Sequence, residues 1–544
     1  MNKNAFVVLV IFSVLLSSCG TKTRVDLLVL HARIYTVDSA FSVVNAMAIS
    51  KGQIVATGSD EALLQAYAAT DTLDAAGKII YPGLIDAHAH FVGYGLGLAT
   101  VNLVDTQSWE EVLQRLKTAA PGTDSSDWLI GRGWDQNDWP VKEFPSKELL
   151  DQQFPERPVL LTRIDGHAAI ANQKALDAAK LHAGITLAGG EVETKNGQLT
   201  GILIDNAVDL VSSDIPPPTV QKVKTGLLSA QRNCFAVGLT TVDDCGLDAD
   251  AIQFIDSLQK TGELKMRIYA MLSDNKKNFD FAAKQGKIKT AGLNVRSFKV
   301  YADGALGSRG ACLLQPYTDK PGWSGFLLSA PAHFDSVAAV IQQLGFQMCT
   351  HAIGDSGNRT ILRTYEKYLK GKNDARWRIE HAQVVNTADF ALFGNNSIIP
   401  SVQPTHATSD MYWADKRLGP EREKGAYALK QLLQQNGWLP LGTDFPVEDI
   451  SPFKTFYAAV VRKDAKGYPA TGFQMENAID RQQALRGMTI WAAKANFEEN
   501  EKGSLEKGKM ADFILLDRDL MTTPPDQLLG SKVLATYING QKVF

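Results

Sequence analysis

This sequence of 544 residues contains few cysteines and prolines and has a small net charge. None of its five cysteines forms a CxxC pair, so a zinc ribbon or a thioredoxin-type motif has no support. With 21 prolines, 45% hydrophobic and 21% charged residues, the composition disfavours collagen, coiled coil and disorder. The net charge of -3 offers no concentrated basic surface, so nucleic acid is not an expected partner.

Long apolar runs are also rare, and the one at the N-terminus is short. Lys3 precedes an apolar stretch over residues 5–16, which is too short to span a bilayer but typical of a secretory signal. The stretch ends in Leu16-Ser17-Ser18-Cys19-Gly20, which resembles a bacterial lipobox. We therefore expect residues 1–19 to be a lipoprotein signal. Acylated Cys19 would anchor the protein in the bacterial cell envelope, and Gly20 after it favours the outer membrane or periplasmic side. The alternative is a buried N-terminal helix with an incidental cysteine.

The other four cysteines are Cys234, Cys245, Cys312 and Cys349. They lie in apolar or glycine-rich stretches that read as strands, where free cysteine behaves as a small buried hydrophobe. Two disulfides are possible in an oxidising compartment. We expect buried thiols instead.

Both ends of the chain read as short strands separated by turns. Residues 25–80 contain valine- and isoleucine-rich runs with the turn signals Lys51-Gly52 and Gly77-Lys78, and a similar block closes the chain. Neither end can bury a core alone. The pattern predicts one small β-sandwich assembled from residues 20–80 and 500–544.

Between these ends, apolar strands alternate with longer helical stretches, as in repeated βα units. Eight strands can be counted, which is the number of the (β/α)8 TIM barrel, so we expect an α/β fold with a barrel over residues 81–499. More than a hundred residues separate the first strand from the second, which is far more than one crossover needs. An inserted module is therefore expected at about 93–235. The eight segments are KIIYPGLIDAHAH, GLTTVDDCG, LKMRIYAML, VRSFKVYADG, GFQMCTHAIG, RWRIEHAQV, IIPSVQPTH and WLPLGTDFPV.

Two histidines close the first of these strands in Asp86-Ala87-His88-Ala89-His90. Side chains at i and i+2 share one face of a strand, so both imidazoles can bind one cation. An isolated HxH triplet is more often a surface or core accident. Polar residues on the other strands therefore have to distinguish a metal-binding pair from such an accident.

Lys299 occupies the fourth strand on the same face as Ser297, Tyr301 and Asp303. A lysine inside a barrel is costly unless it is neutralised or paired. Desolvation exposes a nucleophilic amine that can capture carbon dioxide, and the resulting carbamate could bridge two divalent ions. The alternative is a salt bridge from Lys299 to Asp303.

Three further polar residues close strands five, six and eight: His351, His381 and Asp444. Singly, each histidine could be a hydrogen-bonded structural residue and Asp444 a helix cap. Asp444 could equally take a proton from a water molecule. Their joint order at the carboxyl ends of barrel strands favours an active site, because that face carries the chemistry in parallel barrels.

This order of HxH, Lys, His, His and Asp resembles the amidohydrolase superfamily over nearly all of the chain after the signal. Several longer motifs look like the amidohydrolase family 3 branch, which includes N-substituted formamide deformylase-like proteins. These motifs are YPGLIDAHAH, GRGWDQNDW, RIDGHAAIAN, FKVYADGALGSRGA, THAIGDSGN and RLGPER.

The resemblance implies a metal-dependent hydrolase of amide, N-formyl or N-acyl C–N bonds, with a small-molecule amide substrate. By position, His88, His90 and Asp444 would bind one divalent ion, His351 and His381 a second, and carboxylated Lys299 would bridge them. Zinc is the expected metal, in one or two ions per chain. A metal-bound hydroxide would attack the carbonyl, with Asp444 as the base that passes the proton to the leaving nitrogen.

Other polar and aromatic residues are expected near the substrate. His167, in the inserted module, is a candidate second electrophile or substrate clamp, or else the cap of the helix after it. Trp134, Asp135 and Trp139 could form a wall of the pocket or act as packing anchors. The remaining candidates for substrate contact are Asp303, Gln403, His406 and Arg417.

Two other functions compete with this interpretation. By resemblance, mononuclear deaminases of the same superfamily use a glutamate three residues after the strand-five histidine, and here that residue is Gly354, followed by Asp355. An inactive substrate-binding lipoprotein would be indicated by loss of a metal ligand, and none of the six is missing. N-acyl amino acids, N-formyl amines, cyclic imides, carbamates and esters all stay open as substrates, and no interface pattern indicates the oligomeric state.

Overall fold

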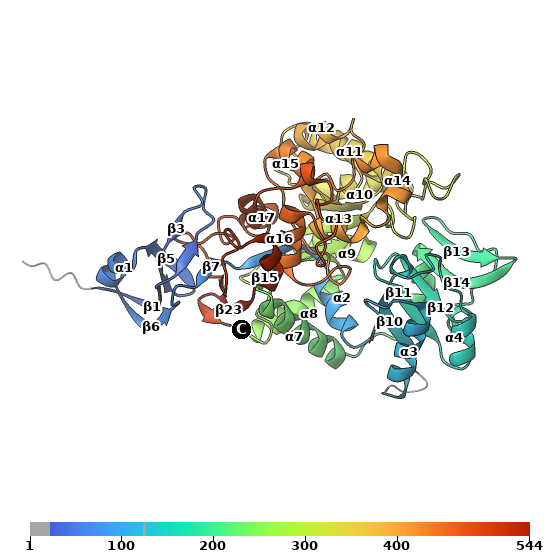
Figure 1. The fold of residues 1–544 in the computed structure, drawn as a ribbon, viewed down its shortest axis with the longest axis horizontal. Coiled ribbons are helices and arrows are strands. Elements are labelled where there is room, and N and C mark those ends of the chain that lie inside the picture. Colours follow the sequence, from blue (N-terminus) through green and yellow to red (C-terminus); the bar gives the residue numbers. More distant parts are fainter. Residues whose placement is uncertain (1–21, 123–126) are drawn as a thin grey trace, which may run out of the picture.

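In the computed structural model, which describes residues 22–122 and 127–544, a barrel lies between two smaller β-structures. Figure 1 shows the sandwich of the chain ends on one side of the barrel and the inserted module on the other. The expected signal segment with Cys19 lies outside the described residues. Along the described ranges, no helix combines the length and apolarity needed to cross a bilayer.

The barrel strands form one parallel sheet in which β8 and β21 are the outermost members. Their side chains are buried on both faces, because helices cover the outside and side chains fill the inside. The antiparallel β17 (Ile288–Lys289) joins the edge of β18. In order around the sheet the strands are β8 (Leu84–Ala89), β15 (Leu239–Leu247), β16 (Arg267–Ser273), β18 (Leu293–Tyr301), β19 (Gln347–Ala352), β20 (Arg378–His381) and β21 (Ile399–Ser401).

Amphipathic helices follow the strands and pack their apolar side against the sheet. Typical signals set their ends: α10 (Pro331–Leu344) starts with proline and stops at Gly345, which is left-handed with φ of 68°. The other helices of this region are α2 (Phe91–Gly97), α7 (Val220–Ala236), α8 (Ala249–Lys260), α9 (Lys276–Gln285), α11 (Asp355–Leu369), α12 (Phe390–Asn395), α13 (Pro404–Asp410), α14 (Ala414–Glu423), α15 (Leu429–Asn436), α16 (Pro452–Val461), α17 (Arg481–Gly487) and α18 (Ile490–Ala495).

Residues 439–445, the expected eighth strand, close the barrel without forming a regular strand. On one side, the Gly442 amide donates to the Val402 carbonyl at 3.0 Å. On the other side, the Asp444 amide donates to the His88 carbonyl at 2.7 Å. The predicted eight-membered barrel is therefore confirmed, with an irregular segment in the eighth place.

The sandwich combines both ends of the chain, as predicted. One sheet contains only N-terminal strands, in the order β5 (Gln53–Gly58), β4 (Ala46–Ser50), β1 (Thr23–Leu30) and β6 (Tyr67–Asp74), with α1 (Asp60–Ala66) beside it. The other mixes the two ends, in the order β24 (Gln541–Lys542), β23 (Val533–Ile538), β22 (Phe513–Leu516), β7 (Ile79–Pro82), β2 (Arg33–Tyr35) and β3 (Val43–Val44). Its core contains apolar residues from both ends, among them Val29, Ile49, Ile80, Phe513 and Tyr537.

A buried ion pair joins this sandwich to the barrel. Arg267 at the start of β16 holds Asp512, just before β22, with Nε 2.6 Å from Oδ2 and Nη2 2.9 Å from Oδ1. Both side chains are almost fully buried.

The inserted module is a mixed sheet with its own core. Its strands run in the order β13 (Gly190–Lys195), β14 (Gln198–Asp205), β12 (Ala168–Ala171), β11 (Val159–Arg163), β10 (Leu129–Trp134) and β9 (Val101–Asn102). Its helices are α3 (Trp109–Ala119), α4 (Glu148–Gln153), α5 (Gln173–Ala178) and α6 (Asn206–Ser212). Within the expected range of 93–235, this sheet occupies residues 101–205, whereas α7 packs into the barrel core.

The four cysteines among the described residues are free thiols, as predicted. Cys234, Cys245 and Cys349 are buried as expected, whereas Cys312 is only half-buried. Burial raises the pKa of the Cys312 thiol to about 11.

Candidate metal centre

The histidine pair and the lysine meet inside the barrel. His88 and Lys299 are almost fully buried, and the Lys299 Nζ lies 3.2 Å from the His88 Nε2. The ring of His90 lies 5.8 Å from that of His88, centre to centre. Asp303, the alternative partner of Lys299, instead accepts the backbone amides of Ile353, Gly354 and Cys312. Lys299 and the HxH pair thus face one compartment.

Two more imidazoles come from neighbouring strands. His351 on β19 and His381 at the end of β20 have ring centres 4.6 Å apart, and the ring of His381 lies 4.7 Å from that of His88. Burial lowers the pKa of both His351 and His381 well below the ordinary value. Both rings are therefore neutral at pH 7, which is the form that binds metals.

Asp444 reaches the same compartment from the segment that closes the barrel. Its Oδ1 lies 3.3 Å from the His90 Nε2 and 3.7 Å from the His88 Nε2, and its Oδ2 lies 3.6 Å from the His406 Nε2. Burial opposes ionisation of Asp444, but the surrounding imidazoles outweigh it and lower the pKa of this carboxyl far below its usual range. The centre thus contains a carboxylate among imidazoles.

The donor set fits a divalent cation. Ligand atoms of His88, His381 and Asp444 lie within 4.8 Å of one another. In the described part of the chain, four buried atoms of this centre lack a hydrogen-bond partner, namely His351 Nε2, His381 Nδ1, His406 Nε2 and Asp444 Oδ1. Buried polar atoms are normally satisfied, so their concentration in one place points to a ligand that accepts electron pairs.

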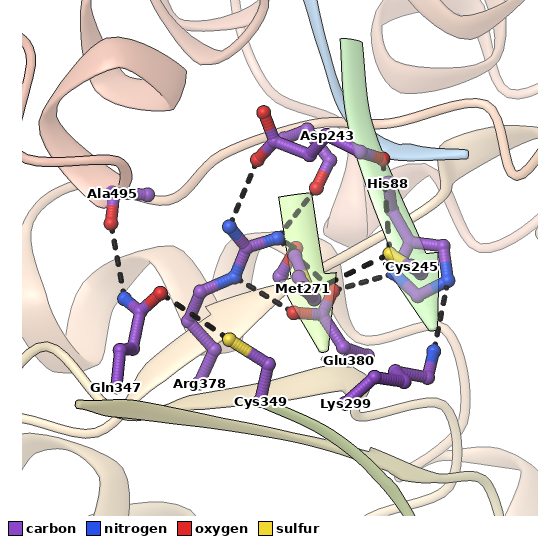
Figure 2. Close-up of polar contacts among 12 residues, drawn as sticks. His88, Asp243, Cys245, Met271, Lys299, Gln347, Cys349, Arg378, Glu380 and Ala495 are labelled. Carbon is purple, nitrogen blue, oxygen red and sulfur yellow. Dashed lines mark hydrogen bonds and ion pairs between the residues drawn. The ribbon is translucent and has the colours of Figure 1, made fainter. Parts of the chain in front are cut away.

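Glu380, which our sequence analysis missed, positions His88. Its Oε2 lies 2.6 Å from the His88 Nδ1, so His88 presents Nε2 to the centre (Figure 2). Arg378 Nε lies 2.7 Å from Glu380 Oε1, and Arg378 Nη1 lies 2.9 Å from Asp243 Oδ2. Burial alone would raise the pKa of Glu380, but the Arg378 charge outweighs it and lowers that pKa to about 2. A carboxylate behind a ligand histidine fixes the ring and its tautomer.

His167 approaches from the inserted module. Its ring lies 5.0 Å from that of His351, and its Nδ1 lies 2.6 Å from Asp205 Oδ1. The helix that His167 could have capped is capped instead by Asn172, whose side chain accepts the Ala175 amide. His167 therefore faces the cavity with its second nitrogen free of Asp205.

A cavity of about 790 Å³ opens above the centre, between the barrel and the inserted module. A volume of this size suits a small-molecule substrate. The predicted site residues that line it are His90, Asp135, His167, Lys299, His351, His381, His406 and Asp444.

Five residues predicted near the substrate lie behind the cavity wall instead. One of them, Trp139, donates its indole N–H to the Thr106 carbonyl at 2.8 Å. Trp134 donates its indole N–H to the Leu161 carbonyl at 2.9 Å and packs in the core of the inserted sheet. Arg417 is buried against Asp319, and Gln403 donates to the Ser401 carbonyl. The fifth is Asp303, whose oxygens are occupied by the backbone amides named above. Each of these side chains is thus hydrogen-bonded or paired with other groups of the protein and does not face the cavity.

Comparison with known proteins agrees with this centre. Residues 71–544 match the profile of the Amidohydrolase family. The chain is 33% identical to "Protein LONG AFTER FAR-RED 3" of Arabidopsis thaliana, over 95% of this chain and 91% of the relative. It is 26% identical to "N-substituted formamide deformylase" of Arthrobacter pascens, over 95% and 97%.

Among solved structures, the fold is similar to that of an uncharacterized metal-dependent hydrolase from Pyrococcus horikoshii. The TM-score is 0.74 at 27% identity, covering 92% of this chain and 99% of the other. The profile match spans most of the sequence, and the barrel carries the expected ligand types at the carboxyl ends of its strands. This chain belongs to the amidohydrolase family.

Proposed function

We propose that this protein hydrolyses an amide-type C–N bond, with N-formyl or N-acyl amines as its substrates and a divalent ion, zinc by preference, as its cofactor. The observation that supports this most is the approach of Lys299 to His88 beside Asp444, because a lysine amine there is a potential carbamate among metal ligands. The similarity to a protein named for deformylase activity points to the same bond type.

Different residues of the chain would bind the metal, transfer the proton and contact the substrate. His88, His90, His351, His381 and Asp444 would hold the metal. Carboxylated Lys299, formed when its nitrogen bonds to carbon dioxide and loses a proton, would supply two oxygen ligands. A metal held there would polarise the substrate carbonyl and lower the pKa of water. Asp444 would take the proton of the attacking water and pass it to the leaving nitrogen, while His167, oriented by Asp205, would donate a hydrogen bond to the substrate.

One structural observation disfavours a deaminase. The residue three positions after His351 is Gly354, and a Cβ atom built there would lie 2.0 Å from the Cys312 carbonyl oxygen. No side chain fits at that position without backbone movement. The glutamate by which deaminases are recognised therefore has no place in this site.

The test is a screen of the zinc-loaded protein against N-acyl and N-formyl amines, with released amine as readout. Asp444→Asn should lower kcat/KM by about 100-fold or more, because a general base contributes at least that much. Asp280→Asn, in an exposed pair with Lys276, is the matched control. Undiminished amine release after chelation, or release by Asp444→Asn at the wild-type rate, would overturn the proposal.

The carbamate is tested by metal content. Lys299→Ala should bind less metal per chain than the wild type, and added bicarbonate should restore metal binding only to proteins that retain the lysine. Equal metal content in both proteins would contradict a role for Lys299 as a ligand.

A further inference from the structure

The inserted module presents two arginines to the cavity, and only one has carboxylate partners. Arg163 is bonded to both Asp135 and Asp165. Arg132 donates from Nη2 to the Ile164 carbonyl at 3.0 Å, and its Nε is buried without a partner. Over residues 22–122 and 127–544, no carboxylate lies within ion-pair distance of Arg132.

A bulge in β10 places Arg132 and Trp134 on opposite sides of the strand. Arg132 pairs with Thr162 of β11, whereas Trp134 pairs with the next residue, Arg163, so the ladder skips Gly133. Gly133 has a φ of 113°, which disfavours any other residue, and a Cβ there would lie 2.5 Å from a methyl group of Val104. The bulge separates two side chains that a regular strand would place on one face: Trp134 enters the module core and Arg132 lines the cavity.

Two carboxylates, Asp165 and Asp444, act on the Arg132 guanidinium electrostatically, but both are engaged by other groups. Asp165 Oδ2 is taken by Arg163 at 2.5 Å and its Oδ1 by the His167 amide at 3.0 Å. Asp444 belongs to the metal centre. Burying a charge without a partner is costly, so a site that keeps one is arranged for a ligand of opposite charge.

We propose that Arg132 binds a carboxylate of the substrate, so that the substrates are N-acyl or N-formyl amino acids. This rests on the proposed function. In the reaction, water and the amide give the free carboxylic acid and the free amino acid, whose own carboxylate stays on Arg132 throughout. A guanidinium is suited to this role because its N–H groups match the two oxygens of a carboxylate.

The rest of the cavity is compatible with such a substrate. Apolar side chains on its wall, Leu98, Val104, Leu306 and Ile450, provide space for an acyl chain or an amino-acid side chain. The ligand residues lie on the barrel and Arg132 on the inserted module, so one molecule can contact both.

Carboxylates also line this cavity and would favour a cationic substrate instead. Two of them, Asp105 and Asp138, are exposed to solvent. The half-buried Asp410 accepts the Tyr427 hydroxyl at 2.8 Å, and the half-buried Glu448 accepts the Ser409 hydroxyl at 2.6 Å. Asp410 Oδ2 and Glu448 Oε1 are engaged in this way, whereas the Arg132 Nε is buried without a partner. This unpartnered donor is the observation that favours an anionic group on the substrate.

The experiment compares three acetamides of different charge with the zinc-loaded full chain. N-acetylleucine carries the carboxylate, N-acetylisopentylamine is its neutral analogue, and N-acetyl-1,4-diaminobutane carries a cation. We expect the wild type to prefer N-acetylleucine, and Arg132→Met to lower kcat/KM for it by about 10- to 100-fold, as for a lost charge-assisted hydrogen bond. The neutral amide should change by no more than about twofold, because a buried apolar side chain replaces the arginine stem.

Controls separate binding from structure. Arg232→Met, at an exposed helix position, should behave as wild type on all three amides. Guanidinium ion added to Arg132→Ala should restore part of the activity on N-acetylleucine, which a merely structural role would not allow. A wild-type preference for the neutral or cationic amide, or an equal loss on all three in Arg132→Met, overturns the assignment.

Binding of N-acetylleucine, measured by calorimetry, shows whether the Arg132 carboxylate site or the proposed hydrolysis is wrong. If no amide is cleaved but N-acetylleucine binds the wild type and not Arg132→Met, the proposed hydrolysis is wrong and the carboxylate site stands. If N-acetylleucine binds both proteins equally, or neither, the Arg132 site is wrong, whatever the hydrolysis assays show.

Discussion

Both ring nitrogens of His88 have polar neighbours. Nδ1 faces Glu380 and Nε2 faces Lys299 and Asp444. The carboxylate of Glu380 is in turn held by Arg378, so the orientation of the ring depends on a charged group that never reaches the cavity. At the scale of single residues, the metal centre thus extends one layer deeper than its ligands.

The prediction at this scale concerns Glu380. Glu380→Gln keeps the shape of the side chain but removes the charge that both His88 and Arg378 contact, so metal affinity should fall by about 10- to 100-fold. Chelator competition measures it. The matched control is Glu498→Gln, a carboxylate equally buried and paired with Lys289 and Lys502 away from the centre. A similar loss of metal affinity in both variants would contradict the positioning role.

The proposed ligands could be identified from the sequence, whereas Glu380 could not, for a physical reason. His88, Lys299 and His351 were found because they are polar residues near the ends of apolar strands. Glu380 lies next to His381 on a short strand, where adjacent side chains point to opposite faces and a glutamate is expected at the surface. Its partner, Arg378, makes its burial possible, and that pairing is visible only in three dimensions.

The regular alternation of side-chain directions along a strand is interrupted in two elements. Both interruptions determine which side chains reach the site. In β10 the bulge at Gly133 turns Trp134 into the module core, whereas Arg132, two residues earlier, lines the cavity. In the eighth place of the barrel, residues 439–445 keep the hydrogen bonds of a strand only in part, and this irregular backbone delivers Asp444, at φ of 66°. Neither bend follows from hydrophobic pattern, which reports only the average direction of side chains.

The prediction at this scale concerns Gly442, at the closest contact of that segment with β8. A Cβ at Gly442 would lie 2.6 Å from the His88 amide nitrogen and 2.8 Å from the His88 Cβ. Gly442→Ala should therefore lower the free energy of unfolding by about 1–3 kcal/mol and reduce bound metal, because the strand carrying His88 must move. Urea unfolding and metal analysis measure the two effects.

Gly97→Ala serves as the control, because a Cβ there meets nothing within 4 Å. It should leave stability unchanged or raise it by up to about 1 kcal/mol, since alanine is the better helix former. Equal stability of the two variants would show that the contact at Gly442 can relax.

At the scale of the whole molecule, three bodies lie in a row, and apolar side chains of the sandwich such as Tyr81, Ile514 and Ile538 pack into the barrel core. The barrel supplies most of the metal centre, the inserted module covers it, and the sandwich lies on the far side (Figure 1). The expected division into these parts followed from strand-and-turn patterns, whereas the link between sandwich and barrel did not. Asp512 and Arg267 are 245 positions apart in the chain, and nothing in either local pattern pairs them.

The prediction at this scale is a large cost for breaking that link. Asp512→Ala leaves the buried guanidinium of Arg267 without its carboxylate and should lower the free energy of unfolding by about 3–5 kcal/mol. Asp280→Ala, which removes the exposed partner of Lys276, should change it by no more than about 1 kcal/mol. Urea denaturation of both variants measures the difference, and equal costs would mean that Arg267 finds another partner or solvent.

The mixed sheet of the sandwich has a consequence for biosynthesis. Strand β7 is synthesised long before its neighbour β22, because the paired residues Pro82 and Phe513 are far apart in the chain. Until then the early strand has an open edge, which is the kind of surface that attracts other chains. The mixed sheet therefore cannot be completed before β22 has been synthesised. A chain interrupted before Phe513 would leave this edge of β7 exposed, and chaperones would have to protect it in the meantime.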